Sequence, residues 1–214
     1  DLLKNYPKTK RDLKTRLAEK SDTDRDIARK FDKEFFDGDR RYGYGGFSYQ
    51  SRFWEPVIPD FQSFYSLTSS SSVLDIGCAK GFMLYDLQRL IPGISVNGID
   101  ISSYAIEHAL ADVKPHLSVG NAIDLPYSDN AFDLVISINT IHNLVLDQCK
   151  HALQEIQRVS KKDAFITVDA YRTDEEKKRM MAWNLTAQTI LHVDDWKHLF
   201  DEVGYTGDYF WFIP

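Results

Sequence analysis

The sequence predicts an α/β fold, in which helices cover a doubly wound, mainly parallel sheet and an N-terminal helical lid is added. Two observations lead to this fold class. From about residue 73 onward, short apolar segments of strand-like composition alternate with amphipathic, helix-like segments. The first apolar segment, 73–78, also runs through a glycine turn directly into a helix-like segment. That strand–turn–helix corner is typical of sheets that bind nucleotides.

We expect the following elements along the chain. Strands are predicted at 73–78, 95–100, 117–121, 132–138, 164–170 and 207–213. Helices are predicted at 81–90, 102–113, 147–159 and 194–203, with a short helical stretch near 174–185. The chain then divides into an N-terminal helical and aromatic lid segment, 1–68, and a sheet-forming domain, 69–214.

Residues 1–41 are predicted to form two helices. Apolar residues recur there at helical spacing in two sets, Leu13 with Leu17 and Ile27 with Phe31 and Phe35. The segment 21–24, Ser-Asp-Thr-Asp, supplies capping residues between the two helices. We expect these helices to pack over the edge of the sheet at which ligands bind.

Residues 40–54 alternate glycines with aromatic residues and follow neither helix nor strand periodicity, so we expect a loop. Flexible glycines and large rings suit a lid that closes over a ligand and excludes water. An equally good alternative is that the rings attach the N-terminal helices to the core.

A glycine turn, Asp75-Ile76-Gly77-Cys78-Ala79-Lys80-Gly81, follows the first predicted strand. Gly77 and Gly81 allow the backbone to turn sharply and to approach a ligand closely. Their spacing differs from the Gly-x-Gly-x-x-Gly pattern of a pyrophosphate-binding turn, and the turn also carries a lysine. A dinucleotide is therefore the weaker interpretation, and an ordinary tight βα corner is the plain structural one.

Three further motifs follow the glycine turn in order: Gly98-Ile99-Asp100, Gly120-Asn121-Ala122-Ile123-Asp124-Leu125-Pro126 and Phe132-Asp133-Leu134-Val135-Ile136-Ser137-Ile138-Asn139. Together, these four motifs resemble those of the class I S-adenosylmethionine (SAM)-dependent methyltransferases. The resemblance covers roughly residues 70–205. It implies the class I fold and SAM as the cofactor.

The resemblance also implies which residues bind SAM. Asp100 corresponds to the acid whose carboxylate accepts hydrogen bonds from the two ribose hydroxyls. Asn121 stands where the family usually has an aspartate, and its amide still offers a carbonyl oxygen or an NH2 group to adenine. In the aromatic loop, Tyr42, Tyr44 and Trp54 are candidates for a cation–π contact with the sulfonium. The predicted cofactor-binding residues are Asp75, Gly77, Cys78, Ala79, Gly81, Asp100, Ile101, Asn121, Ala122, Asn139, Tyr42 and Tyr44.

Catalysis is expected beyond the carboxyl ends of the strands, where Asn139, His142 and Tyr171 are the catalytic candidates. His142 is a candidate general base, because an imidazole titrates near neutrality. Asn139 would orient the acceptor or bind the amino-acid end of SAM, and Tyr171 would project into the same crevice. The alternative for His142 is a structural histidine that caps the following helix. Arg172 is a candidate partner for a substrate carboxylate or phosphate.

Charge and composition limit the possible partners. The net charge is −6; residues 1–41 hold 13 Lys and Arg against 10 Asp and Glu (+3), which leaves 13 against 22 (−9) for the rest. Basic and acidic residues are interleaved as on a solvated helix face, so nucleic-acid binding is not expected. No metal-ligand pattern, membrane-spanning run or signal peptide is found. Two cysteines are too few for a disulfide framework. We expect a cytoplasmic monomer or homodimer.

The sequence thus predicts a SAM-dependent methyltransferase, and an enclosed aromatic lid favours a small-molecule acceptor. Two alternatives stay open, because they use the same SAM motifs. One is an enzyme that cyclises the aminobutyrate chain of SAM and releases methylthioadenosine. The other is a SAM-binding partner subunit without activity. A nucleic-acid methyltransferase is disfavoured, since the residues after 41 are acidic.

Overall fold

The computed structural model describes residues 1–7 and 21–214. Within these residues, seven parallel strands form one sheet in the order β3-β2-β1-β4-β5-β6, and β7 also pairs with β5. The strands are β1 Ser72–Ile76, β2 Ser95–Asp100, β3 Leu117–Val119, β4 Phe132–Ile138, β5 Ser160–Tyr171, β6 Leu191–His192 and β7 Asp208–Phe212. The predicted α/β class and parallel sheet are confirmed.

Helices connect the strands and cover the sheet. The α-helices are α2 Asp22–Ala28, α3 Lys33–Asp37, α4 Ile58–Phe64, α5 Phe82–Leu90, α6 Ser103–Glu107, α7 Leu146–Val159, α8 Asp174–Trp183 and α9 Val193–Val203. Short 3-10 helices are η1 Arg40–Tyr42, η2 Lys114–His116 and η3 Ile141–Asn143. None of the helices described by the structure is long and apolar enough to cross a membrane.

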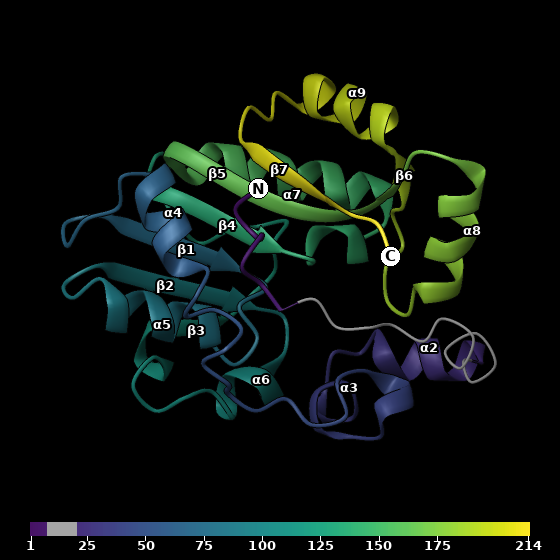
Figure 1. Cartoon of the computed structure of the whole chain (residues 1–214), viewed down its shortest axis with the longest axis horizontal. Coiled ribbons are helices and arrows are strands. Elements are labelled where there is room, and N and C mark those ends of the chain that lie inside the picture. Colours follow the sequence, from purple (N-terminus) through teal and green to yellow (C-terminus); the bar gives the residue numbers. More distant parts are fainter. Residues whose placement is uncertain (8–20) are drawn as a thin grey trace.

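The core lies on both faces of the sheet because successive side chains of a strand point to opposite faces. On one face, Leu74 and Val135 pack with residues of α7 and α9. On the other face, Val73 and Leu134 pack with residues of α4 and α5. Figure 1 shows the resulting three layers, with the sheet between the two sets of helices.

The order of the strands reverses at β1 and β4, which are neighbours although β2 and β3 lie between them in the sequence. In a doubly wound sheet, ligands bind outside the carboxyl ends of the strands at this reversal. Helices α2 and α3 lie at the end of the sheet toward which the strands point (Figure 1). We therefore expect the ligand site at the loops that follow β1, β2, β3 and β4.

The predicted helix through Ile27, Phe31 and Phe35 is wrong. The chain leaves α2 after Ala28, and Phe31 adopts a left-handed conformation with φ +49°. Asp32 then caps α3 through its side chain, because an aspartate before a helix satisfies a free N–H group. The predicted cap at Ser21 is confirmed as a capping box with Asp24. The predicted pair Leu13 and Leu17 lies outside the described residues.

Three other elements differ from the prediction. The helix predicted at 102–113 ends at Glu107, and the N–H of Leu110 turns back to the carbonyl of Lys80 at 3.4 Å. Strand β6 is not among the predicted strands, because it is only two residues long. The strand predicted at 207–213 is shorter, as β7 spans Asp208–Phe212, and it runs parallel to β5.

Candidate cofactor and active site

The turn after β1 requires its glycines. Gly77 has φ +82° and Gly81 has φ +76°, values that residues other than glycine rarely adopt. A Cβ at Gly77 would also lie 2.1 Å from Oγ1 of Thr140, which follows β4. The turn therefore packs closely against the loop after β4. Ala79 shares the left-handed conformation at φ +50°, and its N–H group donates to Oδ2 of Asp100 at 2.8 Å.

Asp100 ends β2 with its carboxylate buried and fixed by two backbone donors. The N–H of Ala79 donates to Oδ2 at 2.8 Å, and the N–H of Ser102 donates to Oδ1 at 2.8 Å. Burial raises the pKa of Asp100, while these two hydrogen bonds lower it. Each oxygen keeps a further lone pair, so the carboxylate can accept two hydroxyl groups.

Residues beside Asp100 provide an apolar surface at the same edge. Ile101 follows directly and is 56% exposed, although it is a large apolar residue. Val119, at the end of the neighbouring strand β3, is exposed as well and pairs in register with Asp100. Exposed apolar residues beside a hydroxyl-accepting acid suit a nucleoside, whose base is flat and whose ribose is polar. The glycine turn, Asp100 and Ile101 thus fit SAM.

Asp75 and Cys78 lie beneath the turn. Burial raises the pKa of Asp75 to about 7, and the nearby charge of Asp100 adds to the rise. Burial likewise raises the pKa of the Cys78 thiol well above its usual value. The thiol is therefore not activated as a nucleophile. Cys78 contributes packing there, in the core on the α5 face.

Asn121 and Ala122 form a tight turn after β3. Oδ1 of Asn121 accepts the N–H of Ile123 at 3.2 Å, and its carbonyl accepts the N–H of Asp124 at 3.2 Å. The Asn121 side chain is exposed, and its NH2 group is available to a ligand because the carbonyl oxygen bonds within the turn. Ala122 packs against the core on the α7 face.

Asn139 lies at the carboxyl end of β4 and is held by β5. Its backbone has φ +53°, and its N–H donates to Oγ1 of Thr167 at 2.8 Å. The same hydroxyl donates to Oδ1 of Asn139 at 2.8 Å. The side chain is exposed, so it faces solvent at the strand end while its orientation is fixed. The sequence did not indicate the role of Thr167, because its partner lies on another strand.

His142 is 4% exposed and lies deeper than Asn139. Its Nδ1 accepts the N–H of Asp169 at 2.9 Å, so the neutral ring carries its proton on Nε2. Burial lowers the pKa of His142, and the charge of Asp169 opposes this only in part. A general base acting through Nδ1 would first have to break this hydrogen bond. The catalytic role of His142 stays a prediction.

Tyr171 ends β5 beside β6 and α8. Its ring lies edge-on to His192 at 5.7 Å, and Nζ of Lys177 lies 5.1 Å from the ring centre. These contacts are with residues outside the loops that carry Asn139 and His142. Arg172 is used within its own segment, since its guanidinium binds Glu176 at 2.6 Å. The sequence interpretation of Arg172 as a substrate partner is thereby weakened.

The three predicted aromatic residues of the N-terminal loop lie in different surroundings. Tyr44 packs on Phe47, with ring centres 4.2 Å apart. Burial raises the pKa of Tyr44 to about 12, and the charges of Tyr6 and Asp100 add to the rise. Tyr42 lies under the guanidinium of Arg41, at 5.1 Å. Trp54 packs on Tyr6 with ring centres 5.0 Å apart.

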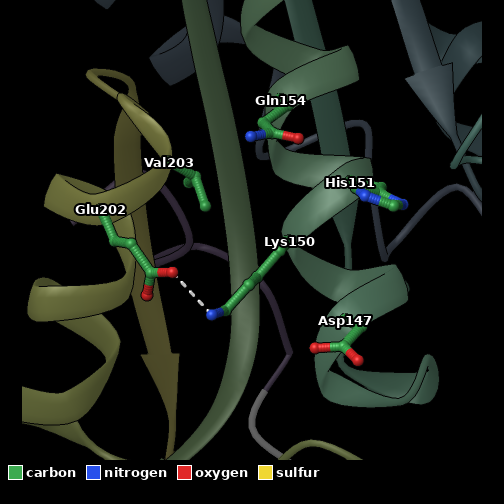
Figure 2. A pocket seen from close by; sticks show the side chains of 6 residues that line it. All are labelled: Asp147, Lys150, His151, Gln154, Glu202 and Val203. Carbon is green, nitrogen blue, oxygen red and sulfur yellow. Dashed lines mark hydrogen bonds and ion pairs between the residues drawn. The ribbon is translucent and has the colours of Figure 1, made fainter.

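A separate hollow lies between α7 and α9. Its cavity volume is about 320 Å³, and its walls are Asp147, Lys150, His151, Gln154, Glu202 and Val203. Figure 2 shows Lys150 extending toward Glu202, with which it forms an ion pair at 2.7 Å. All six residues belong to the two helices, and none belongs to the strand-end loops described above. We assign no ligand to this hollow.

Comparison with known proteins identifies the family of the chain. A family model described as a methyltransferase domain matches residues 67–204. The tRNA (carboxymethyluridine(34)-5-O)-methyltransferase of Arabidopsis thaliana is 28% identical over 162 residues, 69% of this chain and 38% of that protein. The demethylmenaquinone methyltransferase of Symbiobacterium thermophilum is 32% identical over 126 residues, 55% of this chain and 49% of that protein.

A solved structure of a putative SAM-dependent methyltransferase from Methanococcus maripaludis has the same fold. Its TM-score is 0.53 at 20% identity, over 71% of this chain and 76% of that one. Fold and site together define a SAM-binding α/β domain. The chain belongs to the class I SAM-dependent methyltransferases, whose cofactor is SAM. It spans 38% to 59% of the length of the first curated relatives that it matches.

Proposed function

We propose that this protein transfers the methyl group of SAM to a small-molecule acceptor and leaves S-adenosylhomocysteine. The observation that carries the proposal is the buried Asp100 carboxylate, fixed by Ala79 and Ser102 beside the glycine turn. Asp100 ends β2, next to the strand reversal at β1 and β4, where such sheets bind nucleotides. The match of residues 67–204 to a methyltransferase domain supports the same reaction.

Each part of the site would hold one part of the cofactor. Asp100 would accept the two ribose hydroxyls, and Ile101 and the amide of Asn121 would contact adenine. The glycine turn would lie against the amino-acid end, which Asn139 would also reach. SAM supplies an electrophilic methyl group, so the protein needs little covalent chemistry of its own. Its contribution is to hold the reacting atoms in line and to exclude water.

The N-terminal aromatic loop would close the site. Tyr44 is the best candidate in this loop to cover the cofactor, because it packs on Phe47, whose carbonyl accepts a hydrogen bond from Lys80 of the glycine turn. Its face would attract the sulfonium by a cation–π interaction. Tyr42 and Trp54 would then act by packing the loop onto the rest of the chain. His142 would remove a proton only if the acceptor must lose one before the methyl transfer.

The acceptor is proposed to be a small molecule because of the charge of the chain. Residues 42–214 carry 13 basic against 22 acidic residues, which disfavours a polyanion such as RNA. The two curated relatives point to different acceptors, since one name specifies a tRNA and the other demethylmenaquinone. Both cysteines are unpaired, which suits a reducing compartment, and we propose that the protein acts in the cytoplasm as a monomer or homodimer.

Mass spectrometry with methyl-deuterated SAM tests this function. The protein is incubated with labelled SAM alone, and then with a pooled extract of cell metabolites or with total RNA. We expect S-adenosylhomocysteine only with metabolites, together with one metabolite that gains the labelled methyl group. Methylthioadenosine formed from SAM alone would establish the cyclising alternative instead. Label in RNA would contradict the small-molecule acceptor, and binding without turnover would indicate a partner subunit.

A further inference from the structure

Lys80, within the glycine turn, is a buried cation that SAM binding does not explain. It is 7% exposed and directly precedes Gly81, the N-cap residue of α5. A positive charge at the N-terminus of a helix is unfavourable, and a buried charge requires a partner. Nζ of Lys80 lies 2.6 Å from Oδ2 of Asp37 and 2.9 Å from the carbonyl oxygen of Phe47. Both partners belong to the N-terminal segment.

Asp37 gathers three donors from three parts of the chain. Oδ2 accepts from Lys80 and from the hydroxyl of Tyr104 at 2.8 Å, and Oδ1 accepts the N–H of Phe47 at 2.9 Å. Burial alone would raise the pKa of Asp37, but these hydrogen bonds hold it below its usual value. Asp37 is therefore an ionised junction between α3, the glycine turn, α6 and the aromatic loop.

The junction fixes a block of aromatic rings, which we call the strap and define as residues 36–47. Phe36 stacks near Tyr104 at 6.5 Å between ring centres. Phe47 stacks on Phe82, the first residue of α5, at 4.8 Å. Tyr44 lies between these rings and contacts Phe47 at 4.2 Å. The strap therefore packs on the start of α5 and, through Asp37 and the carbonyl of Phe47, on Lys80 of the glycine turn.

We propose that Lys80 and Asp37 are positioning residues that hold the strap closed over the cofactor and thereby set how long SAM stays bound. The pair acts through Tyr44 and Phe47 and does not touch the reacting atoms. The inference rests on the proposed SAM site but adds a function that the motif residues alone do not have. The lysine of the glycine turn then serves the strap, while the glycines serve the cofactor.

Three variants test the positioning role. Asp37→Asn and Lys80→Met remove one charge each at nearly constant volume, whereas Lys80→Arg keeps the positive charge. Glu202→Gln is the matched control, because it breaks the Lys150–Glu202 pair at 2.7 Å on the far helices. The first readout is the dissociation rate of methyl-tritiated SAM, chased with unlabelled SAM. We expect about a tenfold increase for Asp37→Asn and for Lys80→Met, with no further increase in the double variant.

The second readout does not require SAM. Arg40 and Arg41 are exposed trypsin sites within the strap. We expect faster cleavage there in Asp37→Asn and Lys80→Met, with cleavage at Lys177 in α8 unchanged, and rates near wild type for Lys80→Arg and Glu202→Gln. Wild-type protein that binds no SAM would overturn the proposed function, yet the strap would still be tested by cleavage. Unchanged cleavage at Arg40 and Arg41, or equal acceleration at Lys177, would overturn the positioning role.

Discussion

Asp75 and Asp100 are buried carboxylates at the ends of neighbouring parallel strands, and their hydrogen bonding differs. Asp100 accepts two backbone N–H groups at 2.8 Å each, whereas the residues that the structure describes donate none to the side chain of Asp75. Burial and the charge of Asp100 therefore raise the pKa of Asp75 to about 7. At Asp100 the two backbone hydrogen bonds partly offset the effect of burial on the pKa, whereas Asp75 has no such offset and stays protonated below neutral pH.

The raised pKa predicts a pH dependence of stability. Between the ordinary pKa of 3.8 and about 7, the folded protein binds a proton at Asp75 that the unfolded chain has lost. The contribution of Asp75 to the free energy of unfolding therefore falls as pH rises through this window, by about 1.4 kcal/mol for each unit of displacement. Denaturant melts of the SAM-free protein from about pH 5 to about pH 8, across the upper part of this window, should show the decline.

Asp75→Asn is the matching variant. It should flatten this part of the pH profile and make the protein more stable than wild type at the alkaline end, because no buried charge forms. An equally steep decline in Asp75→Asn would show that another group causes it. SAM is cationic, so its affinity for wild type should rise over the same window as Asp75 ionises.

The glycine turn predicts a specific cost for Gly77→Ala. The variant combines a left-handed backbone with a Cβ that meets the side chain of Thr140. Gly204→Ala isolates the first effect, since Gly204 has φ +72° but no atom within 4 Å of the point that an added Cβ would occupy. We expect Gly204→Ala to lower the free energy of unfolding by about 1 kcal/mol and Gly77→Ala by more, with loss of SAM binding. Equal costs in the two variants, with SAM affinity kept, would contradict the close packing of the turn.

The buried hydrogen bond of His142 predicts a loss of stability. His142→Ala leaves the N–H of Asp169 without its acceptor, which should cost about 1–3 kcal/mol in unfolding experiments. His151→Ala, at an exposed position on α7, should cost little. Methyl-transfer rates of His142→Asn, measured against pH, address catalysis separately. Loss of an acidic limb below the usual imidazole pKa would support a general base, and an unchanged profile would remove His142 from the catalytic residues.

Most of the sheet could be predicted because strand composition and glycine turns are local properties. The break at Phe31 could not be predicted, because Ile27, Phe31 and Phe35 have the four-residue spacing of a helix. The left-handed backbone at Phe31 instead separates two short helices, α2 and α3. The parallel pairing of β7 with β5 was also out of reach, because register depends on residues more than forty positions apart, such as Phe165 and Asp208.

The candidate site divides in the same way. Asp100 and the glycines could be named as candidates because each belongs to a short motif that is continuous in sequence. The lysine of the turn could be noted from the sequence. Its ion pair with Asp37 could not be predicted, because Asp37 lies forty-three residues earlier and no sequence pattern links the two. Likewise, the hydrogen bond from Thr167 to Asn139 depends on the pairing of β5 with β4, so the sequence does not indicate it. Polar contacts between residues far apart in the sequence are the part of the site that could not be predicted.

The central claim is that Asp100 holds SAM, and calorimetric titration of SAM into wild type and Asp100→Asn tests it most directly. The amide turns an acceptor toward the ribose into a donor and loses the charge, which should weaken binding by about 1.5–3 kcal/mol, or at least tenfold. Asp201→Asn, at an exposed acid on α9, is the control and should bind as wild type does. Wild-type affinity in Asp100→Asn, or no heat of binding in wild type, would contradict the account.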